Sequence, residues 1–324
     1  MTWLVWRTER VQFCVAAGIL AALTVLLAVT GVQMAHQYDS ALTACRAADS
    51  CGTLGSLFLG SHAVGFLVVL TEGLPAVLGL FWGAPLIAHE LETGTSQFGW
   101  TQSVTRKRWF AVKTGWILLA TAVCAGAVSA LVTWWSGPNN ALQLNRFLPN
   151  RFDIQGIVPV GYALFAVALG IAAGVVFRRT LPALAVTAGG FTAVRLLVVF
   201  LLRPHYMAPV TATYNLASSF APSGSAWVVS SGILGAGAPY TGNGPAMGIG
   251  NVVIPIPPVC QGAAEEPGNG QLMACLGAHG YRASVTYQPA SRFWAFQSIE
   301  TGIFVALAAA LIALAAFVLL RRDA

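Results

Sequence analysis

Charged residues are scarce in this chain of 324 residues. Only 9% are Asp, Glu, Lys or Arg, whereas about 25% are charged in a soluble globular domain. Hydrophobic residues make up 56% of the sequence, and the mean hydropathy is +0.71. The net charge of +6 is not a nucleic-acid-binding patch, because the 17 basic residues form small groups between apolar runs. This composition excludes an ordinary soluble enzyme, a disordered chain and a nucleic-acid-binding module.

The motifs of several common catalysts are also missing. The pair Lys113–Thr114 lacks the glycine that precedes the lysine of a Walker A loop, because Val112 stands there. The run from His89 begins like an HExxH zinc site, but Thr93 replaces the second histidine. No GxSxG nucleophile motif occurs. We therefore expect no catalytic residues, no metal site and no cofactor in this chain.

Long apolar runs, in contrast, are abundant. About 20 helical residues cross a bilayer, and six runs are long enough: 14–34, 63–88, 112–135, 157–177, 181–202 and 296–320. Only residues 178–180 separate the fourth and fifth runs, which predicts a tight helical hairpin. The first run exceeds the apolar stretch of about 7–15 residues in a signal peptide, so we interpret it as a retained span. The sequence thus predicts an all-α polytopic membrane protein with six transmembrane helices.

The basic residues predict how these spans are oriented. With the N-terminus inside, ten of them fall in short cytoplasmic segments, six fall in the longer outer segments, and Arg195 lies within a span. This excess follows the positive-inside rule. We expect both termini in the cytoplasm.

Four of the six cysteines fall on the predicted outer side, where disulfides persist. Three pairings are possible, and sequence proximity favours Cys45 with Cys51 and Cys260 with Cys275. Free buried thiols are the alternative.

The spans divide the chain into three parts. Residues 1–202 hold the N-terminal segment and five spans, including a cytoplasmic loop at 89–112. Residues 203–295 are too long for a simple connector and predict an extracellular cap between the fifth and sixth spans. Residues 296–324 form the last span and a cytoplasmic tail.

Two stretches of the cap carry a structural signal. Residues 226–238 are apolar but too short to span, which favours a re-entrant or surface-lying piece. Residues 282–287 alternate in polarity, so Ala283, Val285 and Tyr287 are expected on one face of a strand. We therefore expect a small mixed cap.

Three ionisable residues, Glu72, Arg195 and Glu300, lie within predicted spans, where charge is costly. Counting 1.5 Å per helical residue places Arg195 about 21 Å, Glu300 about 24 Å and Glu72 about 15 Å from the inner side. Depth therefore favours an Arg195–Glu300 pair, which is either a structural link between spans five and six or a gate or substrate contact. Glu72 is left as a protonated core acid, a partner across a dimer interface or a pathway residue.

The inner loop 89–112 looks the most ordered of the polar stretches. Gly94 is suited to end one helix, and Ser103 or Thr105 to cap the next. Between them Trp100 is exposed unless something binds it. With acidic residues before it and basic residues after it, this element suits either docking to a cytoplasmic partner or lying on the lipid surface.

Two segments resemble the ABC-2-type transporter permeases of high-GC Gram-positive bacteria. The first is Glu90-Leu91-Glu92-Thr93-Gly94-Thr95 with Trp100-Thr101-Gln102-Ser103-Val104-Thr105-Arg106 and Trp109. The second is Tyr287-Gln288-Pro289-Ala290-Ser291-Arg292-Phe293-Trp294 with Gln297 and Glu300. The six spans extend the resemblance over nearly the whole chain, apart from residues 206–281.

The resemblance implies a permease subunit of an exporter in the bacterial plasma membrane, with ATP and Mg on a separate ATPase and a second permease copy as partner. Trp3, Trp6 and Arg7 fit the N-terminal elbow of such permeases. The coupling residues that it implies are Glu90, Glu92, Thr93, Gly94, Thr95, Trp100, Thr101, Gln102, Ser103, Arg106, Lys107, Arg108 and Trp109. The alternatives are a non-transporting sensor or assembly protein whose cap binds a ligand, and a secondary transporter that uses Glu72.

Overall fold

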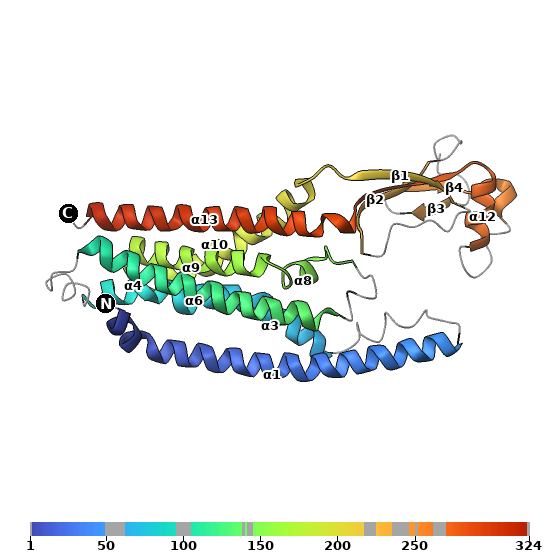
Figure 1. The fold of residues 1–324 in the computed structure, drawn as a ribbon. Coiled ribbons are helices and arrows are strands. Elements are labelled where there is room, and N and C mark those ends of the chain that lie inside the picture. Colours follow the sequence, from blue (N-terminus) through green and yellow to red (C-terminus); the bar gives the residue numbers. More distant parts are fainter. Residues whose placement is uncertain are drawn as a thin grey trace. The chain divides into compact units, whose positions relative to one another are not determined.

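The computed structural model describes residues 2–48, 62–94, 105–137, 140, 145–216, 225–234, 246–249, 252–261 and 270–322. Its internal contacts divide the chain into two compact units, and Figure 1 labels most of their helices and strands. The first unit comprises Met1–Leu144, Leu148–Tyr206 and Trp294–Ala324. The second comprises Asn145–Phe147 and Met207–Phe293, and so overlaps most of the predicted cap segment.

Helices build the first unit. Along the chain they are α1 (Thr2–Ala48), α3 (His62–Leu78), the π-helical turn η1 (Gly79–Gly83), α4 (Ala84–Glu92), α6 (Arg106–Trp135), α8 (Pro149–Phe152), α9 (Val158–Phe177), α10 (Thr180–Leu197), the π-helical turn η2 (Val198–Leu202), the 3₁₀ turn η3 (Arg203–His205) and α13 (Phe293–Arg322).

Five stretches of the described residues are long and apolar enough to cross a membrane. They are Gly65–Glu92, Arg106–Trp135, Val158–Phe177, Thr180–His205 and Ala290–Arg321, which match the second to sixth predicted spans. The protein is thus a mostly helical, multi-pass membrane protein. The predicted first span lies within α1, and the count of six stays a prediction. Helix α1 continues 14 residues beyond the end of the predicted first span at residue 34, to Ala48.

Helix α9 is the most enclosed of these spans. In its most apolar stretch 72% of the residues are buried, compared with 22–33% in the other four spans. Glycines let it approach η1 and α4 closely. A Cβ atom at Gly83 would lie 2.5 Å from the carbonyl oxygen of Val167, and one at Gly170 would lie 2.5 Å from the backbone nitrogen of Ala84. These glycines therefore mark a close backbone contact between α9 and the segment formed by η1 and α4.

The predicted hairpin between the fourth and fifth spans is confirmed. Helix α9 ends at Phe177 and α10 begins at Thr180. Arg178 turns the chain in the left-handed region, with φ at 53°, and its N–H donates to the carbonyl of Gly174 at 3.0 Å.

A small sheet organises the second unit. Strand β5 (Arg282–Gln288) lies between β1 (Val210–Asn215) and β2 (Trp227–Leu234), antiparallel to both. Ala283 and Val285 are buried, as the alternation predicted. The expectation of a re-entrant or surface-lying piece at 226–238 was wrong, because β2 occupies residues 227–234 and pairs with β5. The remaining elements are β3 (Ala246–Ile249), β4 (Val252–Pro255), η4 (Pro258–Cys260), α12 (Gly270–Ala278) and η5 (Ala290–Arg292).

Candidate functional site

The end of α4 is tied to two other helices. Nζ of Lys113 in α6 lies 2.6 Å from Oε1 of Glu90. Oε2 of Glu92 accepts hydrogen bonds from the backbone nitrogen of Thr180 at 2.9 Å and from its hydroxyl at 2.7 Å. A carboxylate at a helix N-terminus satisfies unpaired N–H groups and is favoured by the helix dipole. Both predicted coupling acids therefore hold the spans together, one to α6 and the other to the start of α10.

The caps that flank the inner loop follow the prediction at two positions. Helix α4 ends at Glu92, and Gly94 has a φ of +71°, which glycine adopts without strain. The hydroxyl of Thr105 caps α6 by accepting from the backbone nitrogen of Arg108. Glu90, Glu92, Thr93, Gly94 and Arg106–Trp109 lie at the two ends of this loop, and the coupling residues outside the described range are Thr95, Trp100, Thr101, Gln102 and Ser103.

A cluster of buried charges joins the C-terminus of α8, the turn η3 and α13, and its centre is Arg203. Nε of Arg203 lies 2.9 Å from Oε2 of Glu300, and Nη2 lies 2.6 Å from Oε1 of the same carboxylate. Nη2 also donates to Oδ1 of Asp153. All three side chains are at most 2% exposed. This two-pronged arginine–carboxylate geometry is the strong kind of ion pair.

Arg195 extends this cluster to α3. Its Nη2 lies 2.7 Å from Oε1 of Glu72 and 2.9 Å from Oδ2 of Asp153. Its Nη1 donates to the backbone carbonyl of Glu72 at 3.2 Å. The expected Arg195–Glu300 pair was therefore wrong, because Arg203 occupies Glu300 and Arg195 instead pairs with Glu72, the partner that the depth estimate disfavoured. We name Glu72, Asp153, Arg195, Arg203 and Glu300 the charge cluster.

Aromatic side chains surround the charge cluster. The hydroxyl of Tyr162 donates to Oε1 of Glu300, and that of Tyr206 donates to Oε2 at 3.1 Å. Burial raises the pKa of Tyr206, and the negative charge of Glu300 raises it further. The rings of Tyr162 and Phe304 are 4.6 Å apart in an edge-on contact. This apolar enclosure strengthens each electrostatic interaction and makes an unpaired charge costly.

The charge cluster holds three carboxylates and two guanidinium groups, so it carries a net charge of −1 when all are ionised. Glu72 is its most exposed member, with 31% of the side chain accessible, against 15% for Arg195. Nη1 of Arg203 is buried and has no hydrogen-bond partner among the described residues. The ion pairs among these five residues can lock the spans together.

Gln297 links α13 to the beginning of α9. Its Oε1 accepts from the backbone nitrogens of Ile157 and Val158, both at 3.0 Å, and its Nε2 donates to the carbonyl of Phe152 at 3.0 Å. The side chain is fully buried. Gln297 thus satisfies N–H groups that the first turn of α9 leaves unpaired. The sequence marked Gln297 only through its place in the second resembling segment.

Sequence reasoning missed Asp153 and Arg203. Arg203 was counted among the outer basic residues because the apolar run ends at residue 202, and Asp153 precedes the next run by four positions. An acidic residue close to the start of an apolar run and an arginine at the end of another are the signals that could have found them.

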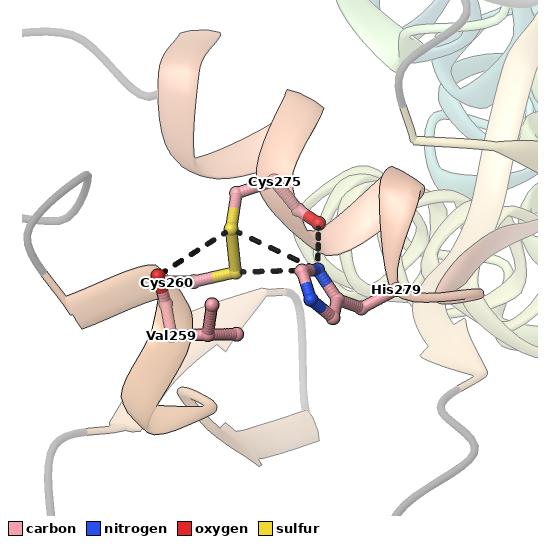
Figure 2. Close-up of a disulfide and its surroundings, with 4 residues drawn as sticks. All are labelled: Val259, Cys260, Cys275 and His279. Carbon is pink, nitrogen blue, oxygen red and sulfur yellow. Dashed lines mark hydrogen bonds between the residues drawn. A yellow bond between two sulfur atoms is a disulfide. The ribbon is translucent and has the colours of Figure 1, made fainter.

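The predicted disulfide between Cys260 and Cys275 is present in the second unit (Figure 2). Nδ1 of His279 lies 2.8 Å from the carbonyl oxygen of Cys275 and 3.9 Å from each sulfur atom. Disulfide sulfurs are not thiolate ligands, so this group is a cross-link and a helix cap. Cys45 is disulfide-bonded, and its predicted partner Cys51 lies outside the described residues.

Comparison with known proteins identifies a family that the chain resembles. The model of a family described as ABC-2 membrane transporter related matches residues 17–203, which is more than half of the chain. No curated protein and no solved structure matches it. The matched range contains both ends of the inner loop and four of the five members of the charge cluster, all except Glu300.

Proposed function

The chain belongs to the ABC-2 membrane transporter related family, and we propose that it is the transmembrane permease subunit of an ATP-driven exporter. The family match over residues 17–203 is the observation that carries this proposal. ATP and Mg would bind to a separate ATPase subunit, in keeping with the lack of a Walker A loop. A second permease copy would complete the substrate pathway, and the positive-inside bias supports cytoplasmic termini.

Coupling to the ATPase is proposed for the segment between α4 and α6. The contacts at its ends support this role, because Glu90 pairs with Lys113 and Glu92 binds the start of α10 at Thr180. A force applied to residues 93–105 would therefore act on three helices together instead of bending one helix end. This connection would convert closure of the ATPase dimer into a rocking motion of the spans.

The charge cluster is proposed to fix the relative positions of the spans during this motion. The ion pairs of Arg203 with Asp153 and Glu300 are enclosed, and breaking one such pair costs about 3–5 kcal/mol when a charge is left buried. Because of that cost, the helices joined by these ion pairs would move together as a rigid group. The spans would then be held together at two places: at the end of α4 by the contacts of Glu90 and Glu92, and at the charge cluster.

The test is co-purification of the full chain with a candidate ATP-binding-cassette ATPase, followed by measurement of ATP hydrolysis. Glu90 and Glu92 are poor positions for the test variant, because their substitution breaks internal contacts. Trp100→Ala in the loop is the better variant. Trp116→Ala is its matched control. Trp116 is also a tryptophan and is 48% exposed, but it lies within α6 and not in the loop.

We expect a stable complex with wild type and with Trp116→Ala, and a complex at least severalfold weaker with Trp100→Ala at unchanged thermal stability. A folded ATPase that does not associate with the wild-type chain would overturn the exporter proposal. The alternative of a membrane sensor would then be tested through ligand binding by the second unit. Association that Trp100→Ala leaves intact would retain the exporter and reject this residue as a coupling contact.

A further inference from the structure

A cavity of about 410 Å³ lies between α6 and α13 in the first unit. We name it the α6–α13 groove. On α6 its lining extends from Lys107 to Leu118, and on α13 from Ile312 to Leu320. Eleven helical steps cover about 16 Å, which is about half of a hydrocarbon core of 30 Å. The groove therefore has the length of one leaflet.

Most of the lining is apolar. Phe110 and Leu319 are buried beneath it, and the exposed small residues Ala111 and Gly115 leave it open along α6. Such a surface accepts a flexible hydrocarbon chain.

One buried hydroxyl in this lining has no partner within the part of the chain that the structure describes. Thr114 is 3% exposed, and its Oγ1 has no hydrogen-bond partner among the described residues. Threonines in apolar helices usually donate to the carbonyl four residues earlier, as Thr121 on the same helix donates to Ile117 at 2.7 Å. Thr114 is thus an available donor for an oxygen atom that occupies the groove, and leaving it unpaired is unfavourable.

The groove is also electrically asymmetric. Lys107, in the first turn of α6, is exposed at its border, and the lining contains no carboxylate. Arg321, the residue after Leu320, adds a second positive charge at the end of α13. A ligand that fits has an anionic group at this end, a hydrogen-bond acceptor about 10 Å further along the axis at Thr114, and an apolar chain beyond.

We propose that the α6–α13 groove binds one anionic phospholipid from the leaflet on the Lys107 side. The phosphate pairs with Lys107, an ester carbonyl accepts from Thr114, and an acyl chain follows the apolar lining. A neutral apolar helix of a partner would leave both Lys107 and Thr114 unused, so charge and hydrogen bonding favour the lipid. The inference is independent of ATPase coupling.

The full chain in detergent is titrated with phosphatidylglycerol or with phosphatidylcholine of the same acyl chains, and retained lipid is counted by native mass spectrometry. We expect one phosphatidylglycerol to be held preferentially. A lysine near an anionic surface contributes about 1 kcal/mol, so Lys107→Gln is expected to lower this preference about fivefold. Thr114→Val is expected to weaken both lipids to a similar extent.

Gly115→Leu fills the groove, because a Cβ atom at Gly115 meets nothing within 4 Å. The matched control is Gly126→Leu, at a glycine of the same helix that is equally open and lies outside the groove. Only Gly115→Leu is expected to abolish retention of the single lipid. Equal binding of the two lipids by wild type, or equal effects of the two leucine variants, would overturn the proposal. Should Gly115→Leu not fold, the exposed variant Lys107→Gln decides, and an unchanged preference then rejects the site.

Discussion

Arg203 and Glu300 form the ion pair whose removal has the most definite consequences. Replacement of either residue by methionine removes one partner of an enclosed pair, which costs about 3–5 kcal/mol. The two single variants are nevertheless unequal. Arg203 pairs with both Glu300 and Asp153, so Arg203→Met makes the net charge of the cluster more negative, from −1 to −2. Glu300→Met leaves two carboxylates facing two guanidinium groups, which restores a balance of charge.

We therefore expect Arg203→Met to be the more destabilising single variant, near 5 kcal/mol, and Glu300→Met to lie near 3 kcal/mol. With a shift of about 2–4 °C per kcal/mol for a unit of this size, the unfolding temperatures fall by about 10–20 °C and about 6–12 °C. The double variant leaves no unpaired partner of this pair. It is expected to unfold no lower than Arg203→Met alone, which corresponds to a coupling energy of about 3 kcal/mol.

The assay is thermal unfolding of the purified chain in detergent, followed by size-exclusion chromatography with fluorescence detection at one heating rate. Arg282→Met, at an exposed arginine of β5, is the control and is expected to shift the transition by less than about 2 °C. Strict additivity of the two variants, or a larger loss for Glu300→Met than for Arg203→Met, would refute the assignment of Arg203 as the centre of the cluster.

Three further predictions concern packing, capping and the cross-link. Gly83→Leu is expected to prevent recovery of folded protein, because its Cβ would lie 2.5 Å from a backbone oxygen, whereas Gly126→Leu on open surface is expected to be tolerated in a detergent solubility screen. Gln297→Ala leaves two N–H groups and one carbonyl of the buried α8–α9 turn unpaired, and a loss of about 2–4 kcal/mol is expected in thermal unfolding. Cys260→Ser with Cys275→Ser opens a loop whose closure contributes about 3 kcal/mol, so limited proteolysis is expected to cleave the second unit faster, and unchanged cleavage would contradict this.

The sequence predicted the structure best where the outcome depends only on residues that are close together along the chain. Apolar length located five spans, and three residues between two of them determined the hairpin. The cap at Thr105 and the helix stop near Gly94 also followed from local chemistry, because each depends on residues within one helical turn. Strand β2 was missed because a short apolar run has the same composition in a strand and in a surface-lying helix, and its partner β5 is about 50 residues away.

The partners in the charge cluster could not be predicted in this way. Depth along a helix fixes one coordinate, whereas an ion pair also depends on the direction in which each side chain points. The prediction further treated residue 202 as the end of a span. In the structure the helix continues through η2 and η3 to His205, which brings Arg203 into the cluster, and the α8 turn brings Asp153 beside it. Glu300 therefore has a nearer partner than Arg195.

Two separate polar contacts join the stretch Gly65–Glu92 to the stretch Thr180–His205. Together they limit how these two stretches can move relative to each other. The stretch Gly65–Glu92 contacts the stretch Thr180–His205 at Glu92 with Thr180, and again at Glu72 with Arg195. These contacts are separated by 20 residues on one stretch and 15 on the other, which corresponds to about 22–30 Å of helix. A single contact would let one stretch rotate about it relative to the other. Two contacts at this distance oppose such rotation. Motion that begins at the inner loop would then reach the charge cluster as a displacement of both stretches together. The proposed coupling segment would require this coordinated displacement, and removal of either contact would be expected to weaken it.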